Sequence, residues 1–247
     1  MSTSPARLSL QDVHADVWHA HTLADPVAQV VATGEAVLDA HLPGGGWPVG
    51  ALTELLQAPG VHAEWRLLLP ALVRCGPAAV ALIGAPHMPF GPALAAGGLA
   101  HQRLLWVQAS AAPDRLWSAE QALRCAGVDA VVAWLPQARS DQLRRLQMAA
   151  AQYNKLLMVL RGEAAQYEAS PAVLRLLLQP HAAHLQLRIL KRRGPPMDHP
   201  VTVPACHAAL ARVLAAVELE DATRQSVGDE GPQPEYIHVL DRTAARA

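Results

Sequence analysis

The stretch that decides the fold is Leu42–Leu68, LPGGGWPVGALTELLQAPGVHAEWRLL. It opens with three glycines and a Trp-Pro turn, continues as a short apolar strand from Ala51 to Leu56, and passes through a Pro-Gly loop into an apolar helix. A strand followed by a glycine-containing loop and a helix is the arrangement in which nucleotide-binding proteins hold phosphate groups. The sequence therefore predicts an α/β fold with a loop of this kind at residues 57–64.

The residues that perform phosphate chemistry are missing from this loop. A functional phosphate loop reads G-x-x-x-x-G-K-[S/T], where the lysine neutralises phosphate charge and the hydroxyl holds Mg²⁺. Here Ala63 and Glu64 stand where the lysine and the hydroxyl residue are required, and Pro59 lacks a backbone donor. We therefore expect no cofactor and interpret the loop as degenerate, on the residues Gln57, Pro59, Gly60, His62, Ala63 and Glu64.

Composition favours one α/β domain with appendages in a chain of 247 residues, of which 51% are hydrophobic. The formal net charge of −1 gives no global basic field for nucleic acid. Cys75, Cys125 and Cys206 are far apart and form no C-x-x-C pair, so we expect reduced thiols and no metal site. The chain shows no signal-peptide pattern and no long uncharged apolar run, so we expect a cytoplasmic protein.

Apolar runs that alternate with helical patterns predict a mainly parallel sheet flanked by helices. The expected helices include 63–75, 118–126 capped by Ser118, and 140–153 capped by Ser140. Two further segments, 173–179 and 185–192, are expected as an antiparallel pair at the edge of the sheet. The expected parallel strands are 51–56, 78–83, 103–108, 129–135 and 156–160.

Three regions are expected along the chain: an N-terminal arm at 1–29, a core at 30–193, and a Pro-rich linker, small helix and flexible tail at 194–247. Two clusters are candidate partner-binding sites, although the first is more typical of a solvated strand end. They are the basic cluster Lys191, Arg192 and Arg193, and the apolar tail patch Tyr236, Ile237, Val239 and Leu240.

The string VVATGEAVLDAHLPGGGWPVGALTELL at residues 30–56 resembles the entry to the core of RecA. Downstream, ALIGAPHMP, RLLWVQ, EQALRCAGVDAVVAWLP and LLMVLRG follow in a similar order. The GGGWPVGALTEL wording and the LKRRG ending most closely resemble the ImuA family of RecA-like proteins from bacterial mutagenesis cassettes. The resemblance covers roughly residues 30–193 and implies a RecA-like core.

The departures from RecA argue against catalysis. Besides Ala63 and Glu64, Pro86 falls where RecA has the glutamate that activates water, and Trp134 falls where it has an aspartate that supports Mg²⁺. We therefore expect that the chain is not an enzyme and has no catalytic residues.

The resemblance implies a non-catalytic accessory protein of DNA-damage-induced (SOS) translesion synthesis. Its implied partners are the ImuB-like Y-family polymerase homologue, the error-prone replicative-type polymerase and RecA, with DNA contact indirect or weak. The alternatives are a SulA-like cell-division inhibitor that binds FtsZ, and an active RecA-type ATPase, which the missing residues disfavour.

Overall fold

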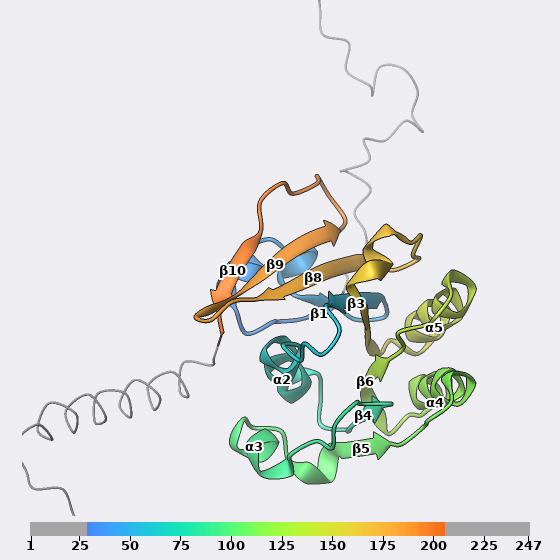
Figure 1. The fold of residues 1–247 in the computed structure, drawn as a ribbon. Helices are drawn as coiled ribbons and strands as arrows, with labels where there is room; N and C mark the ends of the chain where they lie inside the picture. Colours follow the sequence, from blue (N-terminus) through green and yellow to red (C-terminus); the bar gives the residue numbers. More distant parts are fainter. Residues whose placement is uncertain (1–28, 206–247) are drawn as a thin grey trace, which may run out of the picture. The chain divides into compact units, whose positions relative to one another are not determined.

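The computed structural model describes residues 29–205 of the chain. These residues form an eight-stranded sheet with helices on both faces, and a separate two-stranded ladder formed by β1 and β2 (Figure 1). The helices are α1 Ala36–Asp39, α2 Trp65–Arg74, α3 Gly91–Ala96, α4 Ala112–Arg124 and α5 Ser140–Tyr153, with 3-10 turns η2 Pro43–Gly45, η3 His101–Arg103 and η4 Glu163–Tyr167. The strands are β1 Val30–Val31, β2 Trp47–Pro48, β3 Leu52–Gln57, β4 Ala79–Ile83, β5 Leu104–Val107, β6 Val128–Trp134, β7 Leu156–Gly162, β8 Leu174–Pro180, β9 His184–Lys191 and β10 Val201–Pro204.

The large sheet has the order β10-β9-β8-β3-β7-β6-β4-β5. The six strands from β8 to β5 in this order pair in parallel, while β9 runs antiparallel to both of its neighbours. This confirms the expected α/β fold with a mainly parallel sheet flanked by helices, and it is compatible with a RecA-like core. Strands β4, β6 and β7 lie side by side as predicted, and Val132 and Val159 are fully buried.

The core has two main layers, because the central strands are apolar on both faces. On one face, α1, α2 and α3 cover the sheet, with Leu67 and Leu72 of α2 fully buried. On the other face, α4 and α5 pack on the sheet through residues such as Leu123 and Leu143 (Figure 1). Buried side chains on both sides explain why these strands read as continuous apolar runs.

One helix start and one helix cap differ from the prediction. Helix α4 begins at Ala112, six residues before the predicted start, and Ser118 lies inside it. Pro113 occupies the first turn, where its missing N–H costs nothing. Helix α5 does begin at Ser140, but its N-cap residue is Arg139, whose backbone N–H donates to the side-chain oxygen of Gln142 at 2.9 Å.

The edge of the sheet also differs from the prediction. Strands β8 and β9 are antiparallel as expected, but β8 pairs in parallel with β3 and therefore lies inside the sheet. The edge is β10, which falls in a segment that we had interpreted as linker. Val201 and Val203 alternate along β10, and both are buried in the same core cluster as residues of β9. Their burial holds this short edge strand in place despite the neighbouring prolines.

Within residues 29–205, no helix is long and apolar enough to cross a membrane. The predicted N-terminal arm and the tail patch Tyr236, Ile237, Val239 and Leu240 lie outside the described residues.

Candidate functional site at the carboxyl edge of the sheet

The parallel strands all end at one edge of the sheet, which is where ligands bind in open α/β folds. The loops that follow β3, β4 and β6 bring polar and aromatic side chains to this edge. We call these residues the carboxyl-edge cluster, which has two parts. Contacts link Gln57, Glu64, His62 and His87 in one part, and Trp65 pairs with Trp134 in the other.

The first half of the cluster is a buried pair that closes the β3–α2 loop. Gln57 is the last residue of β3, and Glu64 immediately precedes α2 with only 1% of its surface exposed. The Gln57 side-chain nitrogen donates to a Glu64 carboxylate oxygen at 2.9 Å. The other side-chain atom of Gln57, its amide oxygen, is buried without a hydrogen-bond partner among the described residues. An unpaired acceptor is therefore left at the end of the central strand.

The second half of the cluster is an aromatic pair. Trp65, the first residue of α2, lies over Trp134, the last residue of β6, with ring centroids 6.4 Å apart and ring planes tilted by 38°. Trp134 is 7% exposed, and its indole N–H has no acceptor within the described part of the chain. Tryptophan N–H groups normally find a partner when they are buried, so this donor is left unpaired.

Cationic groups at this edge are already engaged. Arg115 donates to the backbone oxygens of Ala109 and Trp134, at 2.7 and 3.4 Å. Arg139 pairs with Asp141 at 3.2 Å, and its hydrogen bond holds the pKa of Asp141 below its usual value. The loop at 57–64 contains no lysine or arginine. A phosphate group therefore finds no ready charge partner beside the Gln57–Glu64 pair.

A buried ion network lies beside the cluster in the centre of the sheet. Glu54 of β3 is fully buried and accepts from Arg161 of β7 at 3.1 Å and from Arg175 of β8 at 2.5 Å. Arg161 also pairs with Glu168 at 2.7 Å. Because both arginines are themselves buried, Glu54 is the charge that makes their burial possible.

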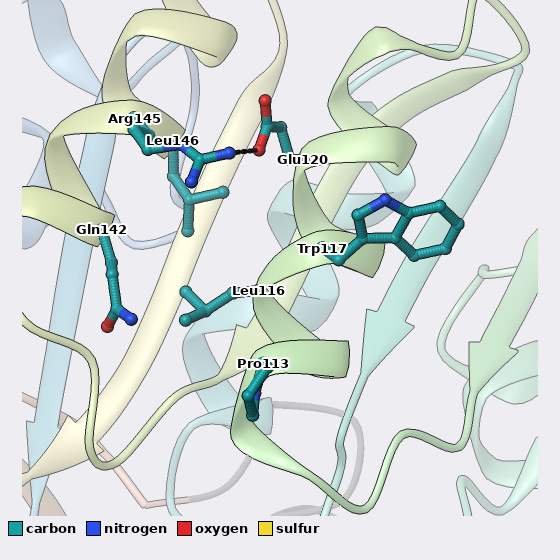
Figure 2. Close-up of a pocket in the computed structure, with 7 residues that line it drawn as sticks. All are labelled: Pro113, Leu116, Trp117, Glu120, Gln142, Arg145 and Leu146. Atoms are coloured by element: carbon teal, nitrogen blue, oxygen red, sulfur yellow. Dashed lines mark hydrogen bonds and ion pairs between the residues drawn. The ribbon is translucent and has the colours of Figure 1, made fainter.

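A shallow groove of about 220 Å³ lies between α4 and α5. Figure 2 shows that Trp117 and Leu116 come from α4, and that the Arg145–Glu120 ion pair joins the two helices. Trp117 is 65% exposed. We assign this groove no ligand. Its lining residues are Pro113, Leu116, Trp117, Glu120, Gln142, Arg145 and Leu146.

The predicted basic cluster is separated from the carboxyl-edge cluster and partly serves the fold. Lys191 donates to the Ser170 backbone oxygen at 3.0 Å. Arg192 donates to the backbone oxygens of Pro195 and His41. Arg193 is exposed. Partner binding by these three residues stays a prediction.

Comparison with known proteins gives one similarity of note. The chain is 34% identical over 100 residues to the FMN-dependent NADH:quinone oxidoreductase of Nocardia farcinica (strain IFM 10152). The matched region covers 35% of this chain and 46% of the relative, so the chain spans about half the length of the curated relative that it matches. No protein-family model matches the chain.

This similarity contradicts two expectations from the sequence. The relative is named as an enzyme, which overturns the expectation that the chain is not an enzyme. It is named as an oxidoreductase, which overturns the expected non-catalytic role in translesion synthesis together with its alternatives. The missing residues argue only against ATP hydrolysis, and redox chemistry does not require them.

The sequence predicted the loop at 57–64 but not most of the cluster. Trp134 was interpreted as the position of a lost metal-supporting aspartate, and Trp65 and His87 were assigned no role at this edge. The available signal was positional, since each of these residues follows or ends a predicted strand or begins a helix at the same edge of the sheet. Glu54, Arg161 and Arg175 were also missed, although a charged residue inside an apolar strand is unusual.

Proposed function

We propose that the carboxyl-edge cluster binds a planar ring of the flavin class and that the chain acts in redox chemistry. One observation carries the proposal: the Trp65–Trp134 pair comes with an unpaired buried donor on Trp134 and an unpaired buried acceptor on Gln57. The name of the Nocardia relative supports the choice of ring, since that protein is described as FMN-dependent.

The ring portion of a flavin matches these groups chemically. The pyrimidine edge of a flavin carries an imide N–H flanked by carbonyl oxygens. The Gln57 oxygen can accept from such an N–H, and the Trp134 indole can donate to such a carbonyl. Indole faces provide the apolar surface that planar ligands require, with few polar groups to fix the orientation. When bound, a flavin would supply hydride and electron transfer.

The phosphate portion of FMN does not match the loop at 57–64. Glu64 is buried there and brings negative charge, while Pro59 removes a backbone donor. We therefore propose that recognition rests on the ring, and that the phosphate adds little to the affinity. This separates the proposal from an ordinary phosphate-loop site.

Fluorescence titration with riboflavin and with FMN tests the proposal directly. We expect both ligands to bind with dissociation constants within about threefold of each other. Trp134→Phe keeps an aromatic ring at this position but removes the indole N–H. The variant should therefore weaken binding about two- to tenfold, since one hydrogen bond contributes about 0.5–1.5 kcal/mol. The control is Trp117→Phe, which changes an exposed indole on α4. Absence of binding by both ligands at 100-fold excess over protein, or equal losses in the two variants, would refute the site.

The redox part of the proposal needs its own measurement. Oxidation of NADH with a quinone acceptor, with flavin added, should proceed faster with the wild-type chain than with Trp134→Phe. If flavin binds but no NADH is oxidised, ring binding stands and the oxidoreductase proposal fails.

We propose separately that the core is RecA-like and related to the ImuA family, and that the loop at 57–64 is a degenerate phosphate loop. The parallel sheet and the composition of the loop support this proposal. Calorimetry with Mg²⁺ and ATP tests the loop, and we expect no binding at micromolar ATP. The ImuB-like, polymerase and RecA partners remain predictions, which direct binding measurements with the purified proteins would test.

A further inference from the structure

Two histidines from separate loops meet at the carboxyl edge of the sheet. His62 lies in the β3–α2 loop, and His87 lies in the loop between β4 and α3. Their Nε2 atoms are 3.1 Å apart, and their rings cross at 82°. The loops follow strands that are not neighbours, since β7 and β6 lie between β3 and β4. The pairing is therefore a product of the tertiary fold.

A buried carboxylate stands on the other side of one ring. An oxygen of Glu64 lies 3.8 Å from Nδ1 of His62, and the second oxygen of Glu64 accepts from Gln57. Glu64 is fixed by this bond and by its burial. The separation of 3.8 Å is longer than a hydrogen bond, so the His62 ring must move towards Glu64 to donate to it, as metal-binding histidines donate to carboxylates in proteins.

We propose that His62 and His87 bind a divalent metal ion of the zinc class through their Nε2 atoms, with Glu64 as the residue that positions His62. Two Zn–N bonds of about 2.0–2.1 Å at a tetrahedral angle place the nitrogens about 3.3–3.4 Å apart. The observed separation of 3.1 Å needs a shift of only a few tenths of an ångström. Imidazole ligands suit zinc, copper and nickel.

The histidine pair supplies two ligands, one fewer than the three protein ligands of a typical open zinc centre. Among residues 29–205, no group of three or more histidine, cysteine, aspartate or glutamate side chains could hold a metal ion. Two protein ligands leave two positions of a tetrahedral ion for water or for an exchangeable ligand. His87 is exposed and the His62 side chain is 37% exposed, so an ion reaches the pair from solvent. Binding would also tie the two loops together.

A second histidine pair provides a matched control. His181 and His184 flank the β8–β9 turn, and their rings stack at 4.6 Å with planes only 20° apart. Stacked rings direct their nitrogen lone pairs within parallel planes, so the two rings cannot both point at one ion between them. This pair has the same residue types in close contact but the wrong orientation for chelation.

Titration calorimetry of the full chain with zinc chloride at neutral pH tests the inference. We expect His62→Gln and His87→Gln each to remove one zinc equivalent or weaken it at least tenfold, while His181→Gln leaves it unchanged. Glu64→Gln should weaken zinc binding about 10–100-fold, as expected when a carboxylate behind a metal-binding histidine is removed. Glu64→Asp serves as the conservative variant and should retain part of the affinity.

Wild-type zinc binding in His62→Gln and His87→Gln would overturn the site, as would an equal loss in His181→Gln. Other histidines of the chain are common to every variant, so the difference between variants carries the result. Riboflavin binding is measured separately. Trp134→Phe leaves both histidines in place, so a loss of riboflavin binding in that variant does not affect the test of the zinc site.

Discussion

The buried charge of Glu54 gives the sharpest test of the fold. Glu54→Gln keeps the size of the side chain but leaves Arg161 with Glu168 as its remaining carboxylate, and leaves Arg175 with backbone oxygens alone. Glu168 is 56% exposed and therefore screened by water. Removing one partner of a buried ion pair costs about 3–5 kcal/mol, because the other charge stays buried without compensation.

This loss is large compared with the stability of a typical domain, about 5–15 kcal/mol. For a structured region of this size, each kcal/mol shifts the melting temperature by about 2–4 °C, so Glu54→Gln should lower it by about 6–20 °C. Urea denaturation followed by circular dichroism should show a lower midpoint with an unchanged slope.

A carboxylate with exposed arginine partners provides the control, and its own side chain is 13% exposed. Glu120 pairs with Arg124 and Arg145, whose side chains are 51% and 71% exposed. Glu120→Gln should cost no more than about 1 kcal/mol, as exposed ion pairs do. If Glu54→Gln and Glu120→Gln destabilise the chain equally, the reasoning about burial is refuted. Replacing Glu54, Arg161 and Arg175 together by apolar residues of similar volume should restore much of the lost stability.

Three further perturbations probe other parts of the fold. Val132→Asp should unfold the domain in thermal denaturation, because it buries an unpaired charge in β6, whereas Val37→Asp on exposed α1 should melt close to wild type. Burial raises the pKa of the Cys75 thiol, so its reactive thiolate forms at higher pH than the thiolate of an exposed cysteine. Peptide mapping after iodoacetamide treatment at pH 8 should therefore show that the exposed Cys125 is alkylated at least tenfold faster than Cys75. The same shift should make stability fall as pH rises above the ordinary cysteine pKa, because the unfolded state loses the proton first. Gly46→Ala should lower the melting temperature, since the added Cβ would lie 2.4 Å from a backbone oxygen of β1 and force the β1–β2 ladder apart.

The amino-acid sequence by itself determined the class of the fold and most of its elements. Apolar runs such as 78–83 and 129–135 identify buried strands, because strands covered on both faces have no polar side to break the pattern. Local signals were less reliable at the ends of elements. Ser118 had the spacing of a helix cap, yet the chain continues as helix through it, because Pro113, five residues before Ser118, already provides a compatible first turn.

Only the tertiary structure decided which distant residues share a site. The order of strands in the sheet depends on how whole helices pack across both faces, and that order brings Trp134 to Trp65 and His62 to His87. The same holds for Glu54, whose two arginines come from the strands on either side of β3. A sequence records spacing along the chain, whereas hydrogen bonds, ion pairs and metal coordination depend on distances of a few ångströms in space, which the packing of the sheet sets.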